Sequence, residues 1–111
     1  MTRVTVTYAG NQIAGLSVEG HAGYASHGRD IVCAAVSCLG ITCVNALEAV
    51  AGVRALVQQS ERDGALSIRL PDELEPQAGH DAQIILRTTV QGYRDIAKAY
   101  PKYLILFDGG K

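Results

Sequence analysis

The chain has 111 residues, 48% of them hydrophobic, and a formal net charge of −1 at pH 7. This length suits one domain, residues 1–111, whose core can form without disulfides or metal. The near-neutral charge, the absence of Trp and the single Phe argue against a basic, base-stacking surface. We therefore expect no direct nucleic-acid partner.

The three cysteines all lie between positions 33 and 43. Two thiols five residues apart on one helix point in different directions and do not easily form a disulfide. We interpret all three as reduced thiols of a cytoplasmic protein. The amino-terminal segment lacks the apolar block of a signal peptide, and the uncharged run 31–47 is shorter than the roughly 20 residues of a spanning helix. We expect a buried central helix and no membrane partner.

The first part of the chain predicts two strands and a loop. Apolar residues alternate with polar ones at Val4, Val6 and Tyr8, and then at Ile13, Leu16 and Val18. Gly15 is a possible bulge in the second strand. Gly20 to Arg29 is a loop long enough to suggest a lid or a binding loop.

A helix is predicted from about Ile31 to Ala51, with Asp30 as its N-cap. This helix is apolar on nearly every face, so it must be covered on more than one side. A chain of this size can hardly provide that cover alone. We therefore expect a homodimer.

The second part of the chain predicts a hairpin, a helix and a final strand. The stretch "VRALVQQSERDGALSIRL" forms the hairpin, with its turn at "RDG", and Pro71 to Gly79 is an irregular connector. An amphipathic helix starts near Asp81 and is ended by Pro101, and "YLILF" is the last strand. The expected fold is a two-layer α+β domain, a mostly antiparallel sheet with two helices packed on it, in the order strand-strand-helix-strand-strand-helix-strand.

Cys33 falls at the third helical position if Asp30 caps the helix. Free backbone N–H groups and the positive end of the helix dipole lie there, and both favour a thiolate over a thiol. Cys33 is therefore the candidate nucleophile. Cys38 and Cys43 fall in mid-helix, where a small buried hydrophobic residue is the usual interpretation.

His21 is the candidate base, since it follows the second strand and lies across the glycine-rich loop from Cys33. Asp30 would orient the imidazole with one carboxylate oxygen and cap the helix with the other. Ser37, one turn after Cys33, would donate a hydrogen bond into the site. Backbone N–H groups at the helix start, including that of Cys33, would hold an oxyanion.

Several other interpretations of these residues remain open. His27, in the loop, competes as the base, whereas His80 is a cap or surface residue. The Cys and His spacing does not fit a metal site, and the glycines Gly20, Gly23 and Gly28 do not match a phosphate loop, so no metal or cofactor is expected. Cys33 and Cys38 could also form a redox pair, although the five-residue step along the helix turns the Cys38 sulfur away from that of Cys33.

The stretch "GHAGYASHGRDIVCAAVSCL" closely resembles the signature of the Prp family, the ribosomal-processing cysteine proteases of bacteria. The resemblance continues weakly through "NALEAVAGV" and returns in "GYRDIAKAYPKYL". It implies a small cytoplasmic homodimer that removes an N-terminal extension from large-subunit ribosomal protein twenty-seven. Cleavage would follow an aromatic pair and precede a small residue. The alternative is a non-catalytic ribosome-assembly factor that binds the same peptide tail.

The resemblance also assigns site residues. The family's nucleophile falls on Cys33 and its histidine on His21. Supporting positions and the substrate-binding loop follow from the same match. They are Asp30, Ser37 and Gly20 as supporting residues, and Ala22, Gly23 and Tyr24 in the loop.

Overall fold

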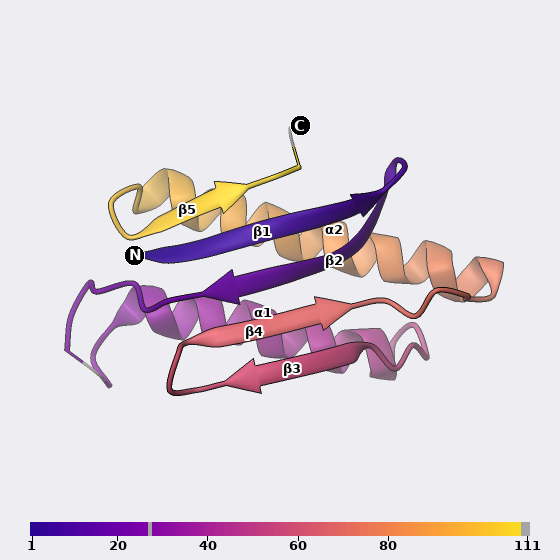
Figure 1. The fold of residues 1–111 in the computed structure, drawn as a ribbon, viewed down its shortest axis with the longest axis horizontal. Coiled ribbons are helices and arrows are strands. Elements are labelled where there is room, and N and C mark those ends of the chain that lie inside the picture. Colours follow the sequence, from indigo (N-terminus) through magenta and orange to yellow (C-terminus); the bar gives the residue numbers. More distant parts are fainter. Residues whose placement is uncertain (27, 110–111) are drawn as a thin grey trace.

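The structure, a computed structural model, describes residues 1–26 and 28–109. Its elements are β1 (Thr2–Ala9), β2 (Gln12–Glu19), α1 (Ile31–Ala49), β3 (Leu56–Ser60), β4 (Ala65–Arg69), α2 (Pro76–Ala99) and β5 (Leu104–Phe107). The strands form one sheet in the order β3-β4-β2-β1-β5 (Figure 1). Every neighbouring pair is antiparallel except β1 and β5, which are parallel. The predicted element order is confirmed, and the sheet is mixed but mostly antiparallel.

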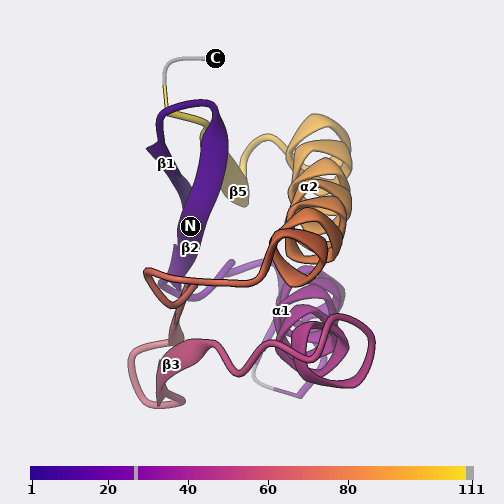
Figure 2. The ribbon, with the colours of Figure 1, turned by 90° about the vertical axis from the view of Figure 1, so that its right-hand side faces the viewer.

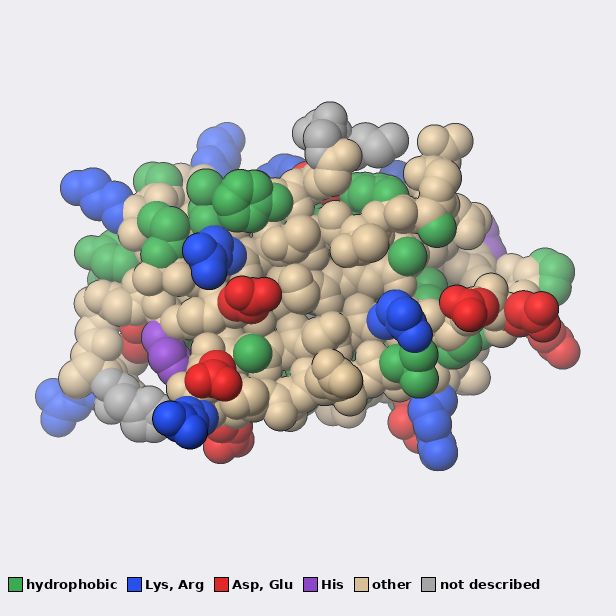
Figure 3. All heavy atoms as spheres, in the orientation of Figure 1, with side chains coloured by type: hydrophobic (Ala, Val, Ile, Leu, Met, Phe, Trp, Pro, Cys, Tyr) green, Lys and Arg blue, Asp and Glu red, His purple; other side chains and the backbone are tan. Residues whose placement is uncertain are grey.

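Both helices lie on the same face of the sheet, which makes a two-layer domain (Figure 2). The core between the layers contains the inward residues of β1 and β2 together with apolar faces of both helices. The opposite face of the sheet is open, and hydrophobic side chains gather there over β5 (Figure 3). These are Ile105 and Phe107, which are 37% and 47% exposed.

The second helix begins earlier than the sequence pattern predicted. It starts at Pro76, and not near Asp81, with Glu75 as the N-cap residue. Proline is well suited to the first helical position, because the N–H that it lacks would have no helical partner there. The expected connector was therefore too long, and only its first residues are irregular. The first helix starts at Ile31 as predicted and ends at Ala49.

The helix α1 is covered by its own chain on one face only. It buries five residues against the core, Val32, Val36, Gly40, Cys43 and Leu47. Ile31 and Ile41 remain 54% and 49% exposed. By length and composition α1 would suffice to cross a membrane, but it packs here against α2 as the core helix of a two-layer domain.

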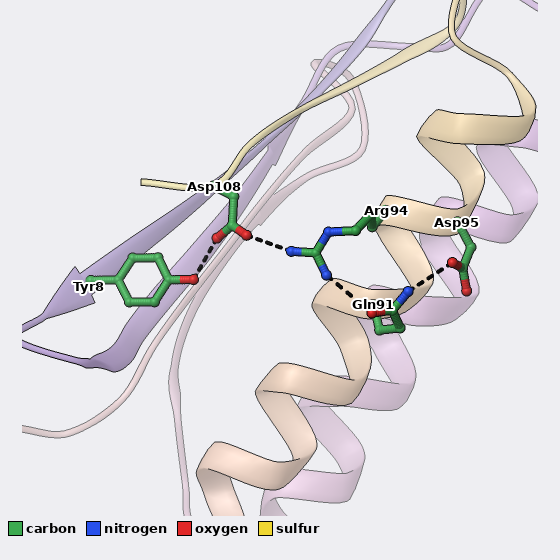
Figure 4. A network of polar contacts seen from close by, with 5 residues as sticks. All are labelled: Tyr8, Gln91, Arg94, Asp95 and Asp108. Carbon is green, nitrogen blue, oxygen red and sulfur yellow. Dashed lines mark hydrogen bonds and ion pairs between the residues drawn. The ribbon is translucent and has the colours of Figure 1, made fainter. Parts of the chain in front are cut away.

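The segment after β5 is tied to both layers by a polar network (Figure 4). The Asp108 carboxylate accepts hydrogen bonds from the Tyr8 hydroxyl of β1 and the Arg94 guanidinium of α2. The hydrogen bond to Asp108 raises the pKa of the Tyr8 hydroxyl above its ordinary value. Arg94 also donates to Gln91, which donates in turn to Asp95. The network fixes the position of β5 relative to α2.

Gly15 lies beside a bulge in β2 and against the backbone of β4. Thr7 pairs with Gly15 and Tyr8 with Ile13, which leaves Ala14 as the extra residue. A Cβ on Gly15 would lie 2.4 Å from the Ile68 carbonyl oxygen. A backbone atom cannot move aside as a flexible side chain can, so the approach of β4 requires glycine.

We predict that Gly15→Ala lowers the free energy of unfolding by about 1–3 kcal/mol, because the added methyl group overpacks the sheet. Gly79→Ala is the matched control. Gly79 lies within α2, and a Cβ there would meet only the Leu74 Cβ at 3.9 Å. Because alanine has the higher helix propensity, this change should stabilise the protein by up to about 1 kcal/mol. Urea denaturation measures both values. Equal effects of the two substitutions would contradict the close approach.

Candidate active site

The site begins at the N-terminus of α1, which Asp30 caps as predicted. Asp30 has extended backbone angles, φ −87° and ψ 102°. Its Oδ1 accepts the N–H groups of Val32 and Cys33 at 3.0 and 2.9 Å. Cys33 is therefore the third helical residue, and the carboxylate holds the backbone of the candidate nucleophile directly.

The second Asp30 oxygen serves the loop, which corrects the expectation that it would orient the imidazole of His21. Oδ2 accepts the N–H groups of Tyr24 and Ala25 at 2.9 and 3.3 Å. Burial by itself would raise the pKa of this carboxyl, but the N–H donors of Cys33, Ala25 and Tyr24 together hold the pKa below its ordinary value. The carboxylate thus joins the loop to the helix.

The predicted oxyanion donors at the helix start are also corrected by the structure. The N–H groups of Val32 and Cys33 are taken by the Asp30 side chain, and that of Ala34 donates to the Asp30 carbonyl at 3.0 Å. The donor that faces the sulfur comes from the loop. The Ala22 N–H lies 3.3 Å from the Cys33 Sγ, and Ala22 is 3% exposed. Cys33 itself is half-buried.

His21 is exposed and rests against the turn between β3 and β4. Its Nε2 lies 3.3 Å from the Arg62 carbonyl oxygen. A carbonyl only accepts, so Nε2 carries the proton in this contact, and Nδ1 is the basic atom of the neutral ring. Gly64 lies close behind the ring: a Cβ there would be 3.1 Å from His21 Cε1 and 2.7 Å from the Gly20 carbonyl oxygen.

Gly20 needs the conformation that only glycine adopts readily. Its φ is +85°, and a Cβ would lie 2.7 Å from the Met1 carbonyl oxygen. Its N–H donates to the Asp63 carbonyl at 3.3 Å, and its own carbonyl accepts the Thr2 hydroxyl at 3.3 Å. The residue before His21 is therefore fixed by β1 on one side and the β3–β4 turn on the other.

Cys33 and His21 line the same groove, of about 800 Å³. Ser37 and Ile41 continue the helical wall beyond Cys33, and Gln59 and Leu66 belong to the opposite wall. The groove exists because α1 leaves the inner side of β3 uncovered. Val57 pairs with the buried Ile68, so it faces the helical layer, yet it remains 40% exposed. The structure thus brings Cys33, His21, Gly20, Asp30 and Ser37 together.

The predicted binding-loop residues have three different environments. Gly23 lines the groove, and Ala22 is the buried residue of the loop, with its side chain turned into the core. The Tyr24 ring packs edge-on against Tyr100 and Tyr103, with centroids 5.6 and 5.1 Å away. The competing base, His27, lies outside the described residues.

The remaining predicted residues have no part in the groove. Cys43 is 1% exposed, and burial raises the pKa of its thiol. Cys38 is exposed, contrary to prediction, because it falls on the uncovered face of α1. His80 is exposed on α2. Within residues 1–26 and 28–109, no group of three His, Cys, Asp or Glu side chains could hold a metal ion.

Sequence patterns did not predict the contacts that distant parts of the chain make with the histidine segment. Thr2, the Arg62 carbonyl and Gly64 all position the histidine segment. The only sequence signal for these contacts was the "RDG" turn, which predicted a hairpin and not its contact with His21. Such contacts between backbone atoms of distant segments do not depend on residue type, so they produce no recognisable sequence pattern.

Comparison with known proteins identifies the class of this protein, which is a cysteine protease. The family model described as cysteine protease Prp matches residues 1–105. The chain therefore belongs to the Prp family of ribosomal-processing cysteine proteases. This membership sets aside the alternative of a non-catalytic binding factor.

The relatives agree in sequence and in fold. The chain is 32% identical over 88 residues to the ribosomal processing cysteine protease Prp of Bacillus subtilis, which covers 79% of each protein. It is similar to the S. aureus Prp structure with a covalently linked product peptide, with a TM-score of 0.87, 26% identity and coverage of 97% and 99% of the two chains. The S. aureus structure with a substrate peptide gives a TM-score of 0.82, 25% identity and the same coverage.

We predict that Asp30→Asn lowers the free energy of unfolding by about 1–3 kcal/mol at pH 7, because an amide NH₂ cannot accept the loop N–H groups. The folded-state pKa of Asp30 is depressed. Its stabilisation is therefore fully present above the unfolded pKa and is lost as pH falls through the folded pKa. Unfolding curves from pH 7 to pH 2 should show the two proteins converging below about pH 4.

The control for this experiment is Asp72→Asn, at an exposed acid in the connector before α2. It should leave stability within about 0.5 kcal/mol of the unchanged protein. A constant difference between Asp30→Asn and the unchanged protein at every pH would contradict the role of the Asp30 charge.

Proposed function

We propose that this protease removes the N-terminal extension of large-subunit ribosomal protein twenty-seven, with Cys33 as nucleophile and His21 as base. The observation that carries the assignment is the position of one sulfur. The Cys33 Sγ lies at the start of α1, faces the Ala22 N–H and opens on a groove that His21 also lines. A thiol, an imidazole and a backbone donor are the groups that acyl transfer requires.

The reaction has two halves. His21 accepts the Cys33 proton, and the sulfur attacks the scissile carbonyl carbon. The Ala22 N–H stabilises the oxyanion, in place of the occupied N–H groups of the helix start. When the C–N bond breaks, His21 returns the proton to the leaving amine. A water molecule, deprotonated by His21, then attacks the thioester, and the released thiolate regains its proton.

The groove is proposed to hold the peptide on both sides of the cut. Its walls are partly apolar, with Val36, Ile41 and Leu66 among the lining residues, and such surfaces suit an aromatic pair before the cleaved bond. The S. aureus relatives bound to a substrate peptide and to a covalently linked product peptide support peptide cleavage. Ser37, exposed in the same groove, is proposed to donate a hydrogen bond to the bound chain.

Cys33→Ala should reduce cleavage of a peptide with two Phe residues before a small residue by about a thousandfold or more, since the nucleophile is lost. Mass spectrometry of the peptide after incubation measures both fragments. Cys38→Ala is the matched control on the same helix and should cleave normally. Peptide that is cut by Cys33→Ala would overturn the assignment. Loss of cleavage in Cys38→Ala, with thiol–disulfide exchange in the unchanged protein, would favour the redox interpretation.

His21→Ala should lower kcat by a factor of about 10²–10⁴, the range of a general base. Circular dichroism and urea denaturation should give a folded protein, because the side chain is exposed. Cleavage at the rate of the unchanged protein would show that another group accepts the thiol proton. The prediction therefore separates His21 from every other base in the chain.

A cytoplasmic homodimer is the proposed form of the enzyme. Ile31 and Ile41, on the side of α1 turned away from its buried residues, are 54% and 49% exposed. They leave an apolar surface that a second copy would cover, next to the groove that Ile41 also lines. Sedimentation equilibrium at micromolar concentration should give twice the chain mass. A mass of one chain at these concentrations would contradict the dimer.

A further inference from the structure

We propose that Tyr24 is a positioning residue, which holds the oxyanion donor of the loop in place through its contacts with Tyr100 and Tyr103. This inference rests on the proposed function of Cys33. It assigns Tyr24 a task other than contact with the substrate. A chain of contacts runs from the C-terminal end of α2 to the sulfur.

The Tyr24 ring leaves the groove and packs on a different part of the fold. It meets Tyr100 and Tyr103 edge-on, with interplanar angles of 90° and 74°. Tyr24 is not among the groove-lining residues, although Gly23 and Ala25 on either side of it are. Edge-to-face ring pairs of this kind attract each other beyond simple burial.

Tyr100 and Tyr103 lie in a turn that is itself held firmly. Tyr100 caps the C-terminus of α2, and the Tyr103 N–H donates to the Tyr100 carbonyl at 3.0 Å. The Tyr103 carbonyl accepts the Thr2 N–H at 2.9 Å, and the Thr2 hydroxyl donates to the Gly20 carbonyl. The turn thus holds the loop at two points, through Thr2 at Gly20 and through the rings at Tyr24.

Between these two points lies the Ala22 N–H, 3.3 Å from the Cys33 sulfur. At the second of these points, the Tyr24 N–H also donates to Asp30. Glycines at positions 20 and 23 have φ of +85° and +73°, so the backbone of this segment is intrinsically free to change direction. The hydrogen bonds at Gly20 and to Asp30 restrain this backbone, and the ring of Tyr24, the largest side chain of residues 20–24, adds a further restraint. Loss of the ring contacts would release the Ala22 N–H from the sulfur.

The test compares three variants. Tyr24→Leu removes both ring contacts, Tyr103→Leu removes the one between Tyr24 and Tyr103, and Tyr24→Phe keeps both. The two Leu variants should lower kcat about tenfold with KM nearly unchanged, because a misplaced donor weakens transition-state binding. Tyr24→Phe should retain most of the activity. The double Leu variant should lose no more than Tyr24→Leu alone, because that substitution already removes both ring contacts.

Phe107→Leu is the control for removal of an exposed aromatic ring elsewhere, since Phe107 is 47% exposed at the end of β5, the strand that follows this turn. It should leave kcat and KM unchanged. A rise in KM at constant kcat in Tyr24→Leu, with Tyr103→Leu unaffected, would make Tyr24 a substrate contact and overturn the proposal. Unchanged kinetics in both Leu variants would overturn it as well.

Amide hydrogen exchange measured by NMR tests the same proposal without a substrate. In both Leu variants the amides of Ala22, Tyr24 and Ala25 should exchange at least tenfold faster, while those of the sheet keep their rates. Unchanged exchange at Ala22 would overturn the positioning role whatever peptide the enzyme cleaves. The exchange rates could rise as expected while the unchanged protein does not cut the peptide. That result would contradict the proposed substrate and would leave the positioning role of Tyr24 supported.

Discussion

One buried carboxylate connects the parts of this site that are otherwise independent. Asp30 accepts two N–H groups at the start of α1 with one oxygen and two N–H groups of the preceding loop with the other. Within residues 1–26 and 28–109 neither set of N–H groups has another hydrogen-bond partner, and buried backbone N–H groups without partners are costly. Helix, loop and candidate nucleophile are therefore held in one arrangement as long as this carboxylate is charged.

This arrangement determines which backbone N–H group is available as the proposed oxyanion donor. A helix N-terminus usually offers free N–H groups to an anion, but here the Asp30 side chain and carbonyl use those nearest to Cys33. In the proposed mechanism the loop supplies the Ala22 N–H in their place, so the candidate groups come from two segments of the chain. The loop carries both Ala22 and His21, which contacts the β3–β4 turn, and α1 carries Cys33.

Local sequence patterns predicted the helices and strands, but they did not predict the contacts between segments that are distant in the chain. Alternation and helical periodicity located β1, β2 and α1, and the preference of aspartate for N-caps located Cys33 in the first turn. The second helix was started too late because Pro76 looked like part of a connector. The second oxygen of Asp30, the Arg62 carbonyl beside His21 and the ring contacts of Tyr24 depend on tertiary folding. No spacing of residue types in the sequence encodes them.

The most direct test of the central claim is the site of covalent attachment by a peptidyl chloromethyl ketone with two Phe residues before the reactive carbon. In a cysteine protease such a reagent alkylates the sulfur that attacks the scissile carbonyl. Tryptic mapping by mass spectrometry should place a single adduct on Cys33, and the adduct should be blocked by excess substrate peptide. Attachment at Cys38, or no attachment while the peptide is still being cleaved, would contradict the account.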